Sequence, residues 1–151
     1  MTIIADAARG EDIIAAARRW IGTPYRHQAS RVRVGADCLG LIRGVYEEVT
    51  GHVAQDPGAY AADWAEHACE ERLLEAAEAH CGPPRSFADA LPGDILVFRW
   101  RAEAAAKHAG ILSSPRRFIH AYEQAGVIES PLTPGWARRV VGVFRFPQRP
   151  E

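Results

Sequence analysis

The order of helical and strand-like patterns along this chain predicts an α+β fold. Helical patterns fill most of the first half, whereas short runs rich in Val, Ile and Phe, separated by turn residues, fill the second half. No repeat, low-complexity tract or linker divides the 151 residues, which are enough to build one core. We therefore expect a single domain over residues 1–151, with N-terminal helices packed on a C-terminal antiparallel sheet.

The first half predicts three helices, and its turn residues set their limits. The first helix stops before a Gly-Thr-Pro turn, and its apolar face includes Ile21. The second helix follows Asp37, a typical N-cap residue, and ends before Gly51, which suits the C′ position. The three helices are expected over residues 11–20, 38–50 and 63–80, with a loop over 52–62.

Five strands are expected in the second half, because β-branched and aromatic residues alternate there with turn signals. They cover residues 94–100, 108–113, 117–122, 126–129 and 140–146. In the third of these, alternation places Phe118, His120 and Tyr122 on one face of the sheet. His120 is therefore expected to be partly buried and to need a hydrogen-bond partner.

Composition and charge argue against several classes of protein. The chain carries 18 basic and 19 acidic residues, so no basic field is present for nucleic acid. No apolar run is long enough to span a bilayer, and the first residues lack the basic and apolar segments of a signal peptide. We expect no nucleic-acid partner, no membrane insertion and no signal peptide.

Cys38 is the first candidate for chemistry, because it stands where a Gly-containing turn leads into the second expected helix. Unpaired backbone N–H groups and the helix dipole favour an anion at that position. Such surroundings lower the pKa of a thiol, and the thiolate is the form that attacks a carbonyl carbon. The alternative is that Cys38 is a small, buried packing residue.

A nucleophilic cysteine needs a base and a group that orients the base. His108 opens an expected strand beside small residues that leave room around it, and alone it could be a surface histidine. The partner of His120 could be a backbone carbonyl or the ring of His108. Together Cys38, His108 and His120 fit a triad of nucleophile, general base and orienting residue.

A zinc site is a competing use of Cys and His side chains. Structural zinc sites normally use two close pairs of ligands, and no such pairs exist around Cys38, Cys69 or Cys81. We therefore expect no metal and no cofactor. Whether Cys69 and Cys81 form a disulfide remains an open question. Free thiols are favoured, because the sequence shows no secretory signal.

Five segments, in order along the chain, resemble motifs of the NlpC family of papain-like cysteine peptidases, which cleave peptidoglycan stem peptides. They are residues 20–25, 37–41, 91–98, 108–111 and 119–121. The resemblance implies an NlpC-type fold with Cys38 as nucleophile, His108 as base and His120 as the orienting residue. It also implies that Tyr25 lines the site near the oxyanion, and that Asp37 contacts the substrate as well as capping the helix.

Within the family, the segment over residues 38–44 is most similar to that of the small peptidases encoded with the tail genes of phages and gene transfer agents. This likeness implies synthesis in the bacterial cytoplasm, incorporation into a phage-like tail, and tail or baseplate proteins as partners. One departure is Leu39, which stands where many endopeptidases of the family have Ser. Two alternatives remain open, namely a structural tail or hub protein with little hydrolysis, and an acyltransferase or amidase that uses the same triad.

Overall fold

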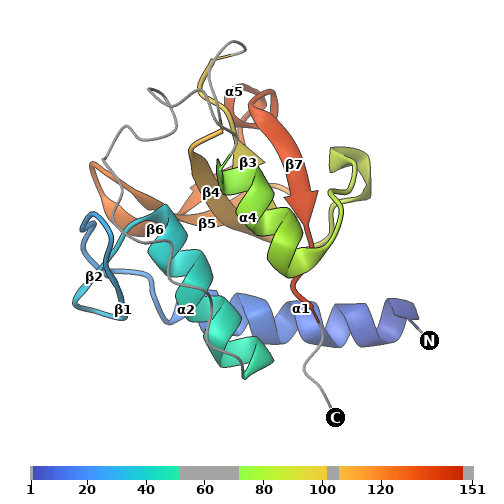
Figure 1. Ribbon diagram of the computed structural model, residues 1–151, viewed down its shortest axis with the longest axis horizontal. Helices are drawn as coiled ribbons and strands as arrows, with labels where there is room; N and C mark the ends of the chain where they lie inside the picture. Colours follow the sequence, from blue (N-terminus) through green and yellow to red (C-terminus); the bar gives the residue numbers. More distant parts are fainter. Residues whose placement is uncertain (1, 52–71, 102–105, 148–151) are drawn as a thin grey trace.

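The computed structural model describes residues 2–51, 72–101 and 106–147, and it has the expected α+β architecture (Figure 1). A five-stranded antiparallel sheet forms its centre, in the order β6-β5-β4-β3-β7. Its strands are β3 (Ile95–Phe98), β4 (His108–Ser114), β5 (Arg117–Tyr122), β6 (Gly126–Pro131) and β7 (Val140–Phe144). The helices are α1 (Thr2–Arg18), α2 (Cys38–Thr50), α4 (Arg72–Cys81), the short η1 (Phe87–Asp89) and α5 (Pro134–Ala137).

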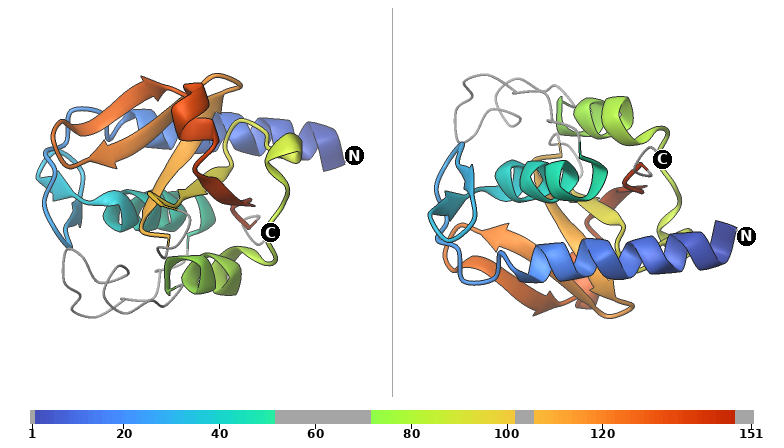
Figure 2. Two further views of the ribbon diagram at one scale, coloured as in Figure 1. Left: turned by 90° about the horizontal axis from the view of Figure 1, so that it is seen from above. Right: turned by 90° about the horizontal axis from the view of Figure 1, so that it is seen from below.

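The sheet has a helix-covered face and an aromatic face. Both α1 and α2 contact β4, whereas α4 contacts β7 (Figures 1 and 2). Side chains of the helix-covered face, such as Ile111 and Ile119, form the larger apolar cluster with those helices. The intervening residues face the other way, where Phe98 and Phe118 pack with Trp136 of α5. This alternation follows from the strand geometry, which points successive side chains to opposite faces.

The expected limits of α2 are confirmed. The Asp37 side chain accepts a hydrogen bond from the Gly40 N–H, and Gly51 ends the helix with a φ of 76°. Two glycines inside the helix have a packing reason. A Cβ on Gly40 would overlap the carbonyl oxygen of Ala29, and a Cβ on Gly44 would overlap the Trp20 ring. These glycines lower helix propensity, but they let α2 lie directly against its neighbours.

The N-terminal region differs from the sequence prediction in two places. The first helix begins before residue 11 and ends at Arg18, and Ile21 beyond it is 42% exposed, so the prediction of a buried Ile21 is wrong. The chain turns there because the Gly22 N–H donates to the Val127 carbonyl of β6. The sequence also predicts no strand between Tyr25 and the second helix, whereas a small hairpin forms there.

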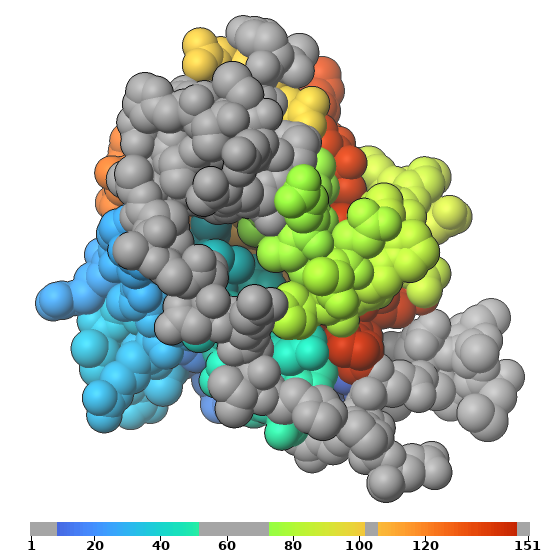
Figure 3. All heavy atoms as spheres, viewed as in Figure 1, coloured from blue at the N-terminus to red at the C-terminus, as the bar shows by residue number. Residues whose placement is uncertain are grey.

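This hairpin consists of β1 (Ser30–Arg31) and β2 (Gly35–Ala36) and stands at the left edge of the space-filling view (Figure 3). Its tip residues Val32 and Val34 are exposed. Its stem holds the start of α2, because the Ser30 hydroxyl donates to the Gly40 carbonyl at 2.6 Å.

The remaining expectations concern the segment before and within α4. Residues 72–81 form the end of the third expected helix, whereas residues 52–71, including the expected loop and Cys69, lie outside the described residues. Cys81 at the end of α4 is a free thiol. Within the described ranges, every helix is too short or too polar to cross a bilayer.

Candidate active site

The Cys38 thiol lies at the first turn of α2, against the beginning of β4. Its Sγ is 3.6 Å from the Lys107 carbonyl oxygen, to which the S–H donates. The backbone N–H of Ala109 also points to the sulfur. Since these are the two chain neighbours of His108, the thiol lies beside the backbone of that histidine. Cys38 as a whole residue is partly exposed, although its thiol is buried.

A hydrogen bond joins the two expected histidines. Nε2 of His108 lies 2.8 Å from Nδ1 of His120. The pairing of β4 with β5 sets Gly110 opposite His120, so the two imidazoles are diagonal neighbours on the aromatic face of the sheet. They are 5% and 1% exposed. The structure therefore brings the candidate base and its orienting residue together. Of the two partners that the sequence leaves open for His120, the one found is the ring of His108.

The chain of hydrogen bonds continues beyond the expected residues. Nε2 of His120 lies 2.9 Å from the Ser130 hydroxyl of β6. The sequence does not predict the role of Ser130, because its position depends on the register of β5 with β6, which sets Ser130 opposite Phe118. Strand alternation alone would have shown only that Ser130 and Ile128 share a face.

Aromatic rings enclose the two imidazoles. Trp100 stacks on His108 with ring centroids 5.3 Å apart. Trp136 of α5 contacts both histidines, with centroids 5.6 Å from His108 and 5.3 Å from His120. Phe118 lies still nearer to His120, at 4.2 Å. These rings replace water around the pair and so disfavour a charge on either histidine. The role of both tryptophans was not predicted, since neither forms part of a sequence motif with the histidines.

Burial dominates the protonation of the site. Burial raises the pKa of the Cys38 thiol to about 12, and the negative charge of Asp37 contributes to the rise. The backbone N–H groups around the sulfur lower this pKa, but only by part of that rise. Burial also lowers the pKa of His108 to about 3, with a contribution from His120, and the pKa of His120 to about 4. The prediction that the helix N-terminus lowers the thiol pKa is therefore wrong. Loss of water outweighs the N–H groups, and the resting thiol and imidazoles are neutral.

Tyr25 lies beside this thiol. Its backbone pairs with Ala36. Burial raises the pKa of the Tyr25 hydroxyl, and the negative charges that Cys38 and Asp37 would carry raise it further. The hydroxyl is therefore within electrostatic reach of the sulfur and stays protonated at neutral pH.

Asp37 is held by the protein itself. One carboxylate oxygen accepts from the Gly40 N–H and the other from the Gln28 N–H, each at 2.8 Å. The side chain is almost fully buried. These contacts account for the capping role, while contact of Asp37 with a substrate stays a prediction.

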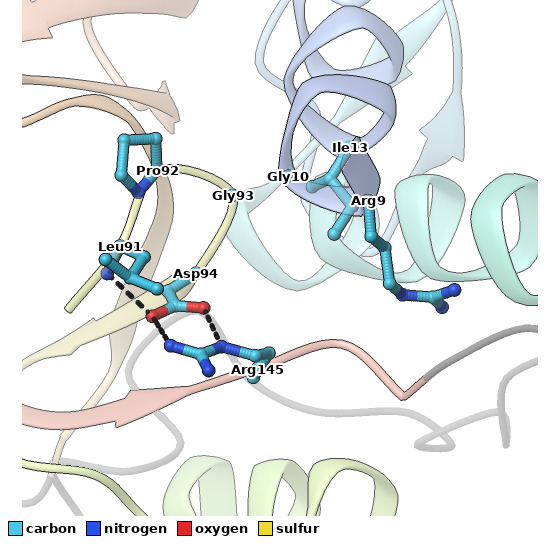
Figure 4. A pocket seen from close by; sticks show the side chains of 8 residues that line it. All are labelled: Arg9, Gly10, Ile13, Leu91, Pro92, Gly93, Asp94 and Arg145. Atoms are coloured by element: carbon cyan, nitrogen blue, oxygen red, sulfur yellow. Dashed lines mark hydrogen bonds and ion pairs between the residues drawn. The ribbon is translucent and has the colours of Figure 1, made fainter. Parts of the chain in front are cut away.

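The motif at residues 91–94 is structural. The Asp94 carboxylate accepts the Leu91 N–H at 2.9 Å and forms an ion pair with Arg145, with 2.9 Å between Nε and Oδ1 (Figure 4). The contacts lock the turn before β3 to the segment after β7. The hollow in Figure 4 is bordered by α1 residues such as Ile13, and none of the candidate catalytic residues lines it.

A helix N-terminal thiol packed beside a buried histidine pair on an antiparallel sheet defines the papain-like class of α+β folds. Comparison with known proteins gives the family. The model of the NlpC/P60 family matches residues 22–145, and the chain belongs to this family.

Two curated relatives are similar in sequence. The Gamma-DL-glutamyl hydrolase of Bacillus subtilis (strain 168) is 27% identical over 146 residues, which cover 95% of this chain and 31% of that protein. A protein of Corynebacterium glutamicum named as a probable endopeptidase is 30% identical over 115 residues, which cover 76% of this chain and 44% of that protein. The chain thus spans less than half the length of these relatives.

Solved structures show the same fold. The NlpC/p60 domain of the peptidoglycan hydrolase SagA superposes with a TM-score of 0.65 at 23% identity, covering 91% of this chain and 98% of that domain. NlpC2 from Trichomonas vaginalis gives a TM-score of 0.65 at 22% identity, covering 91% of this chain and 46% of that chain.

Proposed function

We propose that the protein is a cysteine peptidase that hydrolyses peptidoglycan stem peptides, with Cys38 as nucleophile, His108 as general base and His120 as the residue that orients the base. The observation that carries the proposal is the position of the Cys38 thiol, hydrogen-bonded to the residue before a histidine that itself bonds a second histidine. Membership of the NlpC/P60 family supports it, since relatives with this fold include a peptidoglycan hydrolase and a protein named as an endopeptidase.

The reaction begins with the neutral site. Nδ1 of His108 takes the thiol proton, because its Nε2 is engaged with His120. Burial disfavours both charges in the resting site, so the proton moves as Cys38 Sγ forms its bond to the scissile carbonyl carbon. The imidazolium of His108 then protonates the leaving amine. The same histidine finally activates a water molecule that hydrolyses the thioester and releases the acid.

The oxyanion formed on attack is stabilised by donors at the start of α2. The Cys38 N–H belongs to the helix N-terminus, where backbone donors have no partner within the helix. The Tyr25 hydroxyl is the second donor, and its raised pKa keeps its proton in place. Asp37 holds this end of the helix in position through its two backbone contacts and borders the substrate site.

The scissile bond is proposed to be a γ-glutamyl amide of the stem peptide. The name of the Bacillus subtilis relative supports this class of bond. Leu39 packs against the apolar cluster and offers no polar group beside the nucleophile. The substrate is therefore held by other groups than the Ser that many family members have at this position.

Digestion of soluble muropeptides, followed by mass spectrometry, tests the proposal and identifies the bond. We expect cleavage by the wild type, none by Cys38→Ala and little by Cys38→Ser. Cys81→Ala is the matched control, because it removes a thiol of α4 outside the site and should leave cleavage intact. Cleavage by Cys38→Ala, or the absence of cleavage by the folded wild type, would rule out the proposed reaction.

A place in a phage-like tail, with tail or baseplate proteins as partners, is proposed on the sequence likeness of residues 38–44. Mass spectrometry of purified particles from the source bacterium tests it, since a tail component is present in a fixed ratio to the other tail proteins. Particles that carry Cys38→Ala separate the two roles. Full delivery by these particles would favour a structural component, whereas a delivery defect would favour hydrolysis during entry.

A further inference from the structure

We propose that Ser130 is a positioning residue that sets the tautomers of both histidines. This inference rests on the proposed function, in which His108 must accept a proton from Cys38. The proposal starts from two short contacts in series, 2.8 Å from His108 to His120 and 2.9 Å from His120 to the Ser130 hydroxyl. No sequence motif includes Ser130, and the mechanism described above does not use it.

The two contacts can carry their protons in only one of two directions, because a neutral imidazole has one N–H and one acceptor nitrogen. In the outward direction, His108 Nε2–H donates to His120 Nδ1, and His120 Nε2–H donates to the Ser130 oxygen. This arrangement leaves Nδ1 of His108 free to accept the thiol proton. In the inward direction, Ser130 donates to His120, and His108 is left with its proton on Nδ1. A base in that tautomer cannot take a proton there.

The position of Ser130 favours the outward direction. β6 is an edge strand, and Ser130 is partly exposed, so its own hydroxyl proton can bond to water while its lone pair faces His120. His120 is 1% exposed and has a lowered pKa, so it stays a neutral ring with a single N–H. Either direction gives this N–H an acceptor, which is His108 Nε2 in the inward direction and the Ser130 oxygen in the outward one. The inward direction, however, places an N–H on Nδ1 of His108, which is 5% exposed and has no acceptor there among the described contacts, so the outward direction is favoured.

Removal of the hydroxyl should therefore act on the chemical step. In Ser130→Ala we expect kcat to fall about tenfold, the effect of one hydrogen bond, while KM stays unchanged because the lost contact is to His120 and not to a proposed substrate-binding group. Ser130→Thr keeps the hydroxyl and should recover most of the rate. Ser113→Ala is the matched control, since it removes a hydroxyl of β4 that bonds Glu129 at 2.7 Å and touches neither histidine in the contacts described.

Tautomers measured by NMR test the proposal without substrate. In protein labelled with ¹⁵N-histidine, long-range ¹H–¹⁵N spectra show which ring nitrogen carries the proton, with variants at His108 and His120 giving the assignment. We expect the Nε2–H form for both rings in the wild type and in Ser130→Thr, and a mixture with the Nδ1–H form in Ser130→Ala.

An Nδ1–H ring at His108 in the folded wild type would overturn the proposal, as would unchanged tautomers in Ser130→Ala. The wild-type spectrum decides even if Ser130→Ala fails to fold. Failure of the proposed peptidase would show instead as absent cleavage with the expected tautomers present, so the two failures are distinguishable.

Discussion

Lowering the pH from 8 to 5 should destabilise the folded protein through its histidine pair. Both histidines have folded-state pKa values, about 3 and about 4, below the ordinary 6.5. Below pH 6.5 the unfolded chain therefore binds protons that the folded site does not, so stability is complete above pH 6.5 and is lost as the pH falls toward the folded-state values. At pH 5 the loss is about 2 kcal/mol per histidine.

Together the two histidines account for a loss of about 4 kcal/mol, which is large against the roughly 5–15 kcal/mol of a typical domain. The proposed base has to be neutral to accept a proton. The pH dependence of folding thus reports a state that the mechanism requires.

Urea unfolding followed by far-UV circular dichroism at pH 8, 7, 6 and 5 measures this loss. Replacing one ring by His120→Gln should remove about half of it. Val127→Ala is the matched control, because Val127 is fully buried and carries no titratable group. This control should lower the free energy of unfolding equally at each pH.

Equal free energies of unfolding at pH 8 and pH 5 would refute the assignment of two neutral, buried histidines. An undiminished pH dependence in His120→Gln would refute the share assigned to His120. The series ends at pH 5 because carboxylates titrate below it and would add their own proton uptake.

Two further predictions concern packing and ion pairing. Gly44→Ala places a methyl group against the Trp20 ring and should lower the free energy of unfolding by roughly 2 kcal/mol, measured by thermal or urea unfolding. Gly135→Ala is the control and should cost much less, because the nearest atom to its added Cβ lies 3.6 Å away. Asp94→Asn removes the carboxylate charge that pairs with the mostly buried Arg145 guanidinium and should cost roughly 3 kcal/mol at pH 7. A free energy of unfolding unchanged from the wild type would contradict either assignment.

Local patterns in the sequence predicted most of the architecture. The five strands follow from alternation and turn residues, and all five are present with ends that differ by a few residues. The limits of α2 follow from the side chain of Asp37 and the left-handed conformation of Gly51, both of which act within a few residues. The β1–β2 hairpin was missed because its strands have two residues each, too few to show a pattern.

The site was predicted in part for the same reason. Alternation placed His120 with Phe118 and Tyr122, and ring contacts of 4.2 and 5.5 Å confirm this shared face. The partner of His120 was left open between a carbonyl and the ring of His108, since only strand pairing brings the two rings together.

The sequence by itself determined the order of helices and strands, the start of the helix that carries Cys38, and the residue types able to form a triad. Only the tertiary structure decided that Ser130 and Trp136 join the histidines, because they are brought there by strand register and by the packing of α5. It also decided that the thiol and imidazoles rest uncharged. The position of Cys38 at a helix N-terminus favours an anion, but the amount of water removed by folding depends on residues distant in the chain, and here that removal is the larger effect.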